Sequence, residues 1–200
     1  MATRPAETTG IVLAGGRSSR FGRDKLAEPY RGAPLLHHAV RRLGEVCAEV
    51  VVVLAPDAPE PDGPADVPVR FARDGVPARG PLAGTLAGLM SVRTRLALVA
   101  GGDMPHLDAG VLREMVRVAE PEAVEAVALG DGNRFRPLPC VLRASAAAEN
   151  ARELLAAGRD SLRDLLGSMA VEVIGEPAWR AIDPGGRTLL DVDLPSDLAE

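Results

Sequence analysis

The residue with the clearest chemical potential is Lys25, the one lysine of a chain that holds 22 arginines. It lies just beyond a glycine-rich turn that follows a short apolar segment. Lysine is a compact point charge on a flexible stem, whereas arginine is a planar fork. A site that touches one phosphate oxygen in a narrow cleft can require the former. The alternative is that Lys25 has no special role, and its neighbours argue against that reading.

The turn before Lys25 has the composition of an anion-binding site. Its glycines let backbone N–H groups, those from Gly15 to Arg17, approach a phosphate without interference from a Cβ. Three arginines join Lys25 in supplying positive charge, so an anion site is favoured over a polar surface loop. The turn and its flanks read Leu13-Ala14-Gly15-Gly16-Arg17-Ser18-Ser19-Arg20-Phe21-Gly22-Arg23-Asp24-Lys25. The segment is neither a Walker loop nor a dinucleotide fingerprint, because the lysine and the glycines are differently spaced in those motifs.

Asp103 is the best candidate for a metal ligand. It directly follows an apolar run at 96–100 and two glycines, which places it at the carboxyl end of a predicted strand. Mg²⁺ prefers oxygen ligands and typically uses one or two carboxylates together with substrate phosphates and water. The alternative is that Asp103 caps the following turn. Asp193 could offer a second metal or water ligand, or could cap a last helix together with Ser196.

Hydrophobic patterning predicts strands that alternate with helices. The expected strands are 10–14, 50–54, 69–72, 95–100, 125–129, 139–143, 171–174 and 189–193. The expected helices begin at Pro34 and cover 82–92, 108–119, 144–157 and 161–166, with loops at 56–68 and 130–136. This alternation predicts a doubly wound, mostly parallel α/β sheet in one domain over residues 1–200, with a flexible N-terminus at 1–9. Ligands bind outside the carboxyl ends of such strands.

Composition excludes several classes of function. Aromatic residues make up only 2% of the chain, which argues against stacking on single-stranded nucleic acid. The net charge is −5 and the arginines are dispersed among acids, so no basic stripe is present to attract a nucleic acid. Cys47 and Cys140 lie in apolar surroundings and are expected to be buried thiols, which suits a reducing compartment. No signal peptide or membrane-length apolar run is present, so a cytoplasmic location without a membrane partner is expected.

The segment from Leu13 to Lys25 resembles the signature of the molybdenum cofactor guanylyltransferases, a group of nucleotidyltransferases. The usual pattern is LAGG-x-S-x-R-M-G-x-D-K, and Phe21 in place of methionine is the one difference. The resemblance implies a Rossmann-like nucleotidyltransferase fold.

Further matches extend nearly to the end of the chain. The segment 80–84, Gly80-Pro81-Leu-Ala-Gly, followed by Gly88, resembles the family segment that runs past the nucleotide base, although small residues can also serve close helix–sheet packing. Asp74 resembles the aspartate that contacts guanosine. The segment 102–105, Gly-Asp-Met-Pro, resembles the motif that holds Mg²⁺.

Departures from the family pattern occur at three positions. Leu54 stands where the family has asparagine, Arg136 replaces a histidine, and Leu194 replaces a threonine in the terminal motif Asp191-Val-Asp193-Leu-Pro. The histidines His37, His38 and His106 have no metal-ligand spacing, and the first two are expected to be structural.

The resemblance implies transfer of GMP from GTP to the phosphate of Mo-molybdopterin, with release of pyrophosphate. Mg²⁺ is the implied cofactor, and transient contact with other molybdenum cofactor proteins is implied. Lys25, Arg20 and Asp103 are the implied catalytic residues, and Asp103 the metal ligand. The implied nucleotide-binding residues are Leu13, Ala14, Gly15, Gly16, Lys25, Asp74, Gly80, Pro81 and Asp103.

Two alternatives remain open at this point. Relatives that use CTP usually carry LAAG, so Gly15, which lacks a methyl group, favours GTP without excluding a cytidylyltransferase or a transferase for another phosphate. A noncatalytic GTP-binding protein is the alternative from another class.

Overall fold

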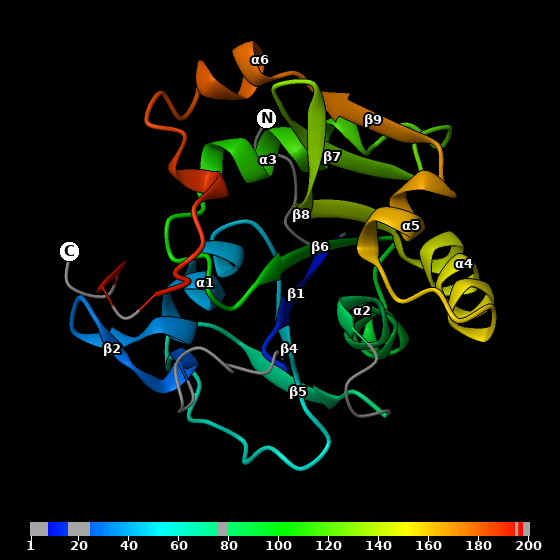
Figure 1. The fold of residues 1–200 in the computed structure, drawn as a ribbon. Coiled ribbons are helices and arrows are strands. Elements are labelled where there is room, and N and C mark those ends of the chain that lie inside the picture. The colour runs from blue at the N-terminus through cyan, green and yellow to red at the C-terminus, as the bar shows by residue number, and fades with distance from the viewer. Residues whose placement is uncertain (1–7, 16–24, 76–79, 195, 198–200) are drawn as a thin grey trace.

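The computed structural model describes residues 8–15, 25–75, 80–194 and 196–197. Seven strands form one sheet, and helices cover both of its faces (Figure 1). The strands are β1 (Thr8–Leu13), β4 (Val50–Leu54), β5 (Val69–Arg73), β6 (Leu96–Gly101), β7 (Ala126–Asp131), β8 (Arg134–Arg143) and β9 (Val171–Ile174). The α-helices are α1 (Leu35–Gly44), α2 (Gly80–Ser91), α3 (Ala109–Val118), α4 (Ala144–Ala156), α5 (Leu162–Gly167) and α6 (Glu176–Arg180). The described residues also form the 3₁₀ turns η2 (Lys25–Ala27) and η3 (Arg187–Leu189) and a small hairpin of β2 (Pro29–Tyr30) and β3 (Ala33–Pro34).

The order of strands in the sheet is β5-β4-β1-β6-β8-β7-β9. The first four strands are parallel, β8 runs antiparallel to β6 and β7, and β9 is again parallel to β7. The predicted mostly parallel α/β sheet is therefore confirmed. Strands β4 and β6 are buried along their whole length, as expected for parallel strands that are covered on both faces and read as continuous apolar runs.

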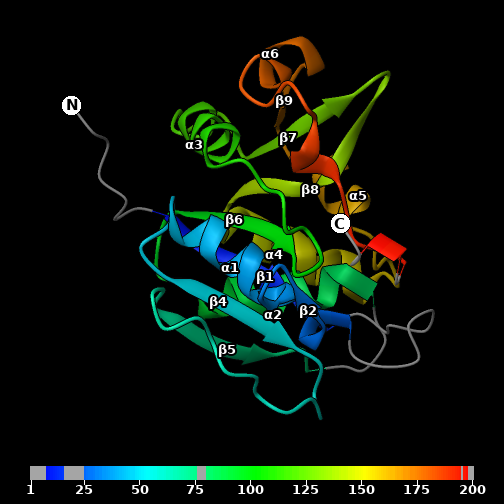
Figure 2. The same cartoon turned by 90° about the vertical axis from the view of Figure 1, so that its left-hand side faces the viewer.

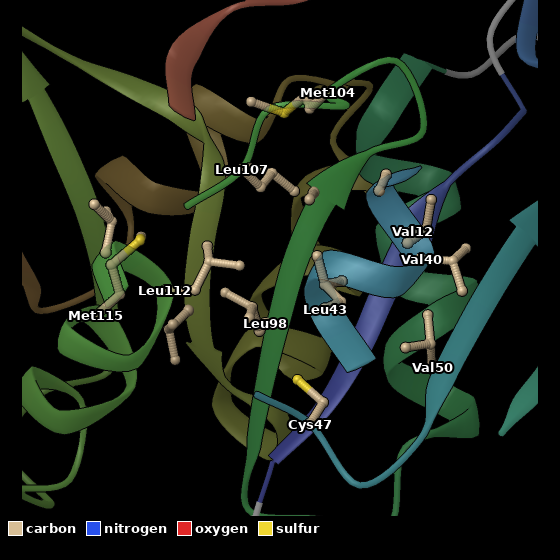
Figure 3. Packing of buried hydrophobic residues seen from close by; sticks show 14 of the residues in the cluster. Val12, Val40, Leu43, Cys47, Val50, Leu98, Met104, Leu107, Leu112 and Met115 are labelled. Atoms are coloured by element: carbon tan, nitrogen blue, oxygen red, sulfur yellow. The ribbon is translucent and has the colours of Figure 1, made fainter. Parts of the chain in front are cut away.

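The core consists of two apolar layers, one on each side of the sheet. The layer under α1, α3 and α6 includes Leu43, Leu98, Leu112 and Met115, which Figure 3 shows packed between strand and helices. The other layer lies under α2, α4 and α5. Leu98 is fully buried, so we attribute to it the ~2–5 kcal/mol that truncation of a core leucine to alanine typically costs.

The parallel half of the sheet brings several strand ends to one edge. The N–H of Gly102 donates to the carbonyl of Leu13 at 3.0 Å, so the chain leaving β6 lies against the end of β1. On the other side of β1, the N–H of Ala14 donates to the carbonyl of Val53 in β4 at 2.8 Å. Figure 2 shows this edge from the side, with the β2–β3 hairpin beside it. The segments predicted to bind ligand thus begin at a common edge.

Most predicted elements are present, with shifts of one or two residues at their ends. Asp108 is the N-cap of α3 as expected, and its carboxylate accepts hydrogen bonds from the N–H groups of Gly110 and Val111. Cys47 and Cys140 are buried free thiols, and burial raises the pKa of each to about 12.

Three predictions about local structure are wrong. The expected loop at 130–136 belongs mostly to β7 and β8, because Gly132 adopts a φ of +59° that permits a tight hairpin turn. The expected strand at 189–193 is irregular chain after η3, since its backbone bonds to the loop after β6 instead of to a strand. Residues Thr8 and Thr9, placed in a flexible N-terminus, are buried in β1.

Candidate active site

The structure brings together two of the predicted site residues that lie 78 positions apart. The ammonium of Lys25 donates a hydrogen bond to Oδ2 of Asp103 at 2.7 Å, at the carboxyl end of β6. The side chains are 15% and 28% exposed respectively, so water screens this ion pair less than a surface pair. Gly16, Arg17, Arg20 and the rest of the cationic turn lie outside the described residues.

The position of Lys25 is also set by the end of the chain. Its Nζ donates to the carbonyl oxygen of Val192 at 3.0 Å and lies 3.6 Å from Oδ1 of Asp193. Val192 in turn donates its N–H to the carbonyl of Asp103 at 2.9 Å, and its side chain is buried against Tyr30 and Leu35. Residues 189–193, named the C-terminal strap from here on, therefore contact Lys25 and help to position it. In Figure 1 this strap is the red chain that runs from η3 toward the β2–β3 hairpin.

The position of the Asp103 carboxylate and of the chain before it depends on two glycines, Gly101 and Gly102, which have no side chain. A Cβ on Gly101 would collide with Oδ1 of Asp103, and a Cβ on Gly102 would lie 3.1 Å from Leu26, 3.2 Å from Leu36 and 3.3 Å from the carbonyl of Leu13. Gly101, which ends β6, therefore leaves room for the Asp103 carboxylate, whereas Gly102 allows the chain after β6 to pack closely against Leu26, Leu36 and the end of β1.

We expect Gly101→Ala to displace the Asp103 carboxylate and to lower the activity of the site about tenfold, since small misplacements of a positioned group are costly. The measurement is steady-state turnover of the variant against the parent. Gly167→Ala is the matched control, because no atom lies within 4 Å of a Cβ at that position. Unchanged turnover in Gly101→Ala would show that the carboxylate position is not critical.

The other predicted nucleotide contacts lie along the same edge. Gly15 follows Leu13 and Ala14 at the end of β1, and a Cβ on Gly15 would lie 3.3 Å from the backbone nitrogen of Ala55. The absence of a side chain on Gly15 thus leaves room next to the end of β4. Asp74 follows β5, with its N–H bonded to the carbonyl of Leu54 at 2.9 Å. The candidate site accordingly extends across the ends of four strands.

The glycines of α2 serve two different purposes. Gly80 begins the helix with a φ of +69°, and a Cβ there would lie 2.8 Å from the carbonyl oxygen of Asp160. Pro81 follows it in the first turn of the helix, where proline is well tolerated. Gly84 and Gly88 face Leu13, Ile11 and Val53 of the sheet, so for these two the alternative of close helix–sheet packing is confirmed.

The alternative that Asp193 caps a last helix falls partly on residues 195 and 198–200, outside the described residues. Asp197 accepts hydrogen bonds from the N–H groups of Asp193 and Leu194, at 3.0 and 2.8 Å. The carboxylate of Asp193 is 61% exposed and lies near Lys25.

The histidines have structural partners. His37 contacts the carbonyl oxygen of Asp62, and His38 that of Tyr30, both at 2.7 Å from Nε2. His106 contacts the hydroxyl of Tyr30 at 2.9 Å. The expectation that His37 and His38 are structural is thus confirmed.

Comparison with known proteins decides the family. Residues 10–173 match the MobA-like NTP transferase domain. The chain belongs to this family. A probable molybdenum cofactor guanylyltransferase of Chloroflexus aggregans is 34% identical over 95% of this chain and 91% of its own, and one of Mycobacterium bovis is 38% identical over 94% and 90%. The crystal structure of molybdopterin-guanine dinucleotide biosynthesis protein A from Archaeoglobus fulgidus superposes with a TM-score of 0.77 at 20% identity, covering 96% of this chain and 95% of that one.

The wider fold includes enzymes with another nucleotide in their names. The 2-C-methyl-D-erythritol 4-phosphate cytidylyltransferase of Thermus thermophilus has a TM-score of 0.70 at 18% identity over 96% of both chains. At this identity the likeness concerns the nucleotidyltransferase fold alone. The protein is therefore a nucleotidyltransferase of the MobA-like family, related to proteins named for molybdenum cofactor biosynthesis.

The sequence did not predict the contacts of the strap with β8. Arg136 of this MobA-like domain donates from Nη2 to the carbonyl of Leu189 at 3.2 Å and lies 3.5 Å from Oδ2 of Asp191. Its Nη1 lies 3.7 Å from Oδ2 of Asp131 in the β7–β8 hairpin. Both Arg136 and the aspartates at 191 and 193 had been noted as motif positions, but nothing in the local pattern links residues 55 positions apart.

Burial raises the pKa of Asp191 to about 6, and the charge of Asp103 contributes in the same direction, against the opposing effect of Arg136. Because this pKa lies above the ordinary 3.8, the fold disfavours the carboxylate form. The free energy of unfolding therefore falls as pH rises from about 4 to about 6, and the loss persists above pH 6.

We expect Asp191→Asn to remove this pH dependence. The difference in Tm between variant and parent should move in favour of the variant between pH 4 and 6 and should then stay constant. Thermal unfolding of both proteins at pH 4, 5, 6 and 8 measures it. A difference that is the same at all four values would contradict the assigned pKa.

The donor set at Lys25 fits a Mg²⁺ ion that arrives with phosphates. Within the described ranges, no three His, Cys, Asp or Glu side chains are grouped closely enough to hold a metal by themselves. Asp103 at the strand end and Asp193, which both lie near Lys25, offer carboxylate oxygens, and Mg²⁺ usually completes such a set with phosphate and water.

None of the helices described is long and apolar enough to cross a bilayer.

Proposed function

We propose that this protein transfers GMP from GTP to the terminal phosphate of Mo-molybdopterin and releases pyrophosphate. The observation that carries the proposal is the contact between the single lysine and Asp103 at the carboxyl edge of the sheet, where ligands of such folds bind. The names of the relatives, probable molybdenum cofactor guanylyltransferases that match nearly the whole chain, support the choice of substrates.

The reaction makes one P–O bond and breaks another. A phosphate oxygen of the acceptor attacks the α-phosphorus of GTP, and the bond from that phosphorus to the bridging oxygen of the β-phosphate breaks. The electron pair of this bond leaves with pyrophosphate. A phosphomonoester is largely ionised near pH 7, so no strong general base is needed. The protein must mainly hold two polyanions together and stabilise charge in the transition state.

Different residues at the edge of the sheet would bind the phosphates, the metal ion and the rest of the nucleotide. Lys25 would bind an oxygen of the triphosphate and stabilise the charge that develops on the leaving pyrophosphate. Arg20 and the backbone amides from Gly15 to Arg17 would add positive charge for the phosphates. Asp103 would hold Mg²⁺, which when bound supplies charge neutralisation for the phosphates. Leu13, Ala14, Gly16, Asp74 and the Gly80-Pro81 start of α2 would bind the rest of the nucleotide.

The contact between Lys25 and Asp103 has a consequence for the order of events. While the ammonium bonds to Oδ2 of Asp103, that oxygen is engaged and its charge is neutralised. An incoming triphosphate with its metal would exchange partners, so that Lys25 contacts phosphate and Asp103 contacts Mg²⁺. Lys25 and Asp103 would thus each have an opposite charge beside them both before and after the nucleotide binds. We place the reaction in the cytoplasm, which the two buried free thiols support.

The test is a competition among nucleotides. Purified protein is incubated with Mo-molybdopterin, Mg²⁺ and equal amounts of ATP, CTP, GTP and UTP, and the dinucleotide product is identified by mass spectrometry while pyrophosphate is measured. We expect the guanine dinucleotide with equimolar pyrophosphate, and neither product when Mg²⁺ is chelated. A cytosine dinucleotide would favour the cytidylyltransferase alternative. Tight GTP binding with no pyrophosphate would favour a noncatalytic GTP-binding protein.

A further inference from the structure

Arg136 lies where the family pattern has a histidine, and its guanidinium is already engaged within the protein. It contacts the carbonyl oxygen of Leu189 and the carboxylates of Asp191 and Asp131, at 3.2, 3.5 and 3.7 Å. Two of these three partners belong to the C-terminal strap. The side chain is only about a third exposed. Its donors therefore face the strap and the tip of the β7–β8 hairpin.

The strap is attached on both sides of the Arg136 contact. Upstream, buried Asp183 accepts hydrogen bonds from the N–H and hydroxyl of Thr188, both at 2.8 Å, just before the strap begins. Downstream, Val192 is buried and bonds to the backbone of Asp103. Between these attachments, Leu190 and Asp191 form no backbone pairing with the sheet. Arg136 supplies a side-chain contact from the sheet to this middle part, through Asp191.

The residues that follow are the ones that hold Lys25. The carbonyl of Val192 accepts from its ammonium at 3.0 Å, and Asp193 lies 3.6 Å away. A shift of the strap by even 1 Å would lengthen these contacts and free the ammonium from one of its oxygens. Displacements of that size at a reacting group can cost up to about 10²-fold in rate.

We propose that Arg136 is a positioning residue, which fixes the C-terminal strap to β8 and thereby holds the Lys25 ammonium beside Asp103. It acts through the strap and does not bind the acceptor phosphate. The role assigned to Lys25 rests on the proposed function, whereas the structural coupling of Arg136 to Lys25 does not.

The single lysine makes this coupling directly measurable. Protein grown with ¹³Cε-labelled lysine has one labelled side chain, Lys25, so its signal reports only this ammonium and its surroundings. The signal of the urea-unfolded chain supplies the reference for a free side chain. In Arg136→Gln we expect the Lys25 signal of the folded protein to move toward that reference, because Gln cannot span from β8 to both strap partners.

Two variants serve as matched controls. Asp131→Asn changes the hairpin partner of Arg136 and leaves its strap contacts, so the Lys25 signal should stay near that of the parent. Arg117→Gln removes an exposed arginine that pairs with Glu114 on α3, away from the strap, and should leave the signal unchanged. If Arg136→Gln does not fold, Asp191→Ala removes one of the two strap contacts of Arg136, leaving that to the Leu189 carbonyl, and should move the signal in the same direction by a smaller amount.

Kinetics separate positioning from acceptor binding. With GTP and acceptor, Arg136→Gln should lower kcat about 10- to 10²-fold while the acceptor KM changes less than about threefold. An unchanged Lys25 signal in folded Arg136→Gln would overturn the proposal. So would an acceptor KM raised more than tenfold with kcat retained, since Arg136 would then be an acceptor ligand. The Lys25 signal requires no turnover, so a failure here is distinguishable from a failure of the proposed function.

Discussion

Lys25→Ala is expected to lower kcat for nucleotide transfer about 10²–10³-fold, the typical loss when one donor that stabilises transition-state charge is removed. The ammonium lies 2.7 Å from Asp103 at the edge where the triphosphate is proposed to bind. Without it, the charge on the leaving pyrophosphate loses its closest compensation among the described residues. The measurement is pyrophosphate release at saturating GTP and acceptor.

Lys25→Arg tests the reason for a lysine at this position. A guanidinium keeps the charge but is wider and planar. The Lys25 side chain is only 15% exposed, and its ammonium lies near Asp103, Val192 and Asp193. We expect Lys25→Arg to recover less than about a tenth of the lost rate. Arg117→Ala serves as the control for loss of a positive charge elsewhere. Parent-like turnover by Lys25→Ala would defeat the proposed role of this residue.

Asp103→Asn is expected to lower kcat by a similar ~10²–10³-fold and to weaken binding of the divalent ion that accompanies GTP. The amide is nearly isosteric, so the strand end and the backbone bond from Val192 to Asp103 should persist. Binding of Mn²⁺ in the presence of GTP, followed by electron paramagnetic resonance, measures the metal independently of turnover.

Asp108→Asn is the matched control for the metal measurement. Asp108 is the N-cap of α3, and asparagine is also a good N-cap, so the fold should be retained. We expect this variant to bind Mn²⁺ as the parent does. Undiminished Mn²⁺ binding in Asp103→Asn would move the metal site away from this aspartate.

The parallel half of the fold was predictable because its strands can be recognised from the local sequence. The run Val50–Leu54 and the run that ends at Gly101 are apolar throughout, and in this fold class such runs become central strands. That Lys25 and Asp103 share one edge follows from the rule for ligand sites in parallel sheets. Their direct ion pair did not follow, since a topology gives an edge but not a distance.

The C-terminal strap was not predictable from local pattern. Leu190 to Asp193 alternates apolar and acidic residues as an exposed strand would, yet Val192 packs on Tyr30 and bonds to Asp103 instead of pairing in the sheet. The contact of Arg136 with Asp191 was not predictable for the same reason. Both depend on tertiary packing between segments far apart in the chain, which single-sequence periodicity does not encode.

The prediction of a loop at 130–136 was wrong for a different reason. The sequence pattern predicts Gly130 and Gly132 as loop residues. In the structure Gly132 supports the turn by its positive φ, and Gly130 lies within β7, where its carbonyl accepts a hydrogen bond from the indole of Trp179. The turn could be predicted from its glycines, but the length of the strands around it could not.

The most direct test of the central claim is a crystal structure of the protein with Mg²⁺ and a GTP analogue that cannot be cleaved between the α- and β-phosphates. We predict a triphosphate oxygen within hydrogen-bond distance of the Lys25 ammonium and Mg²⁺ bound to the Asp103 carboxylate. A triphosphate bound elsewhere, with Lys25 still paired to Asp103, would contradict the account.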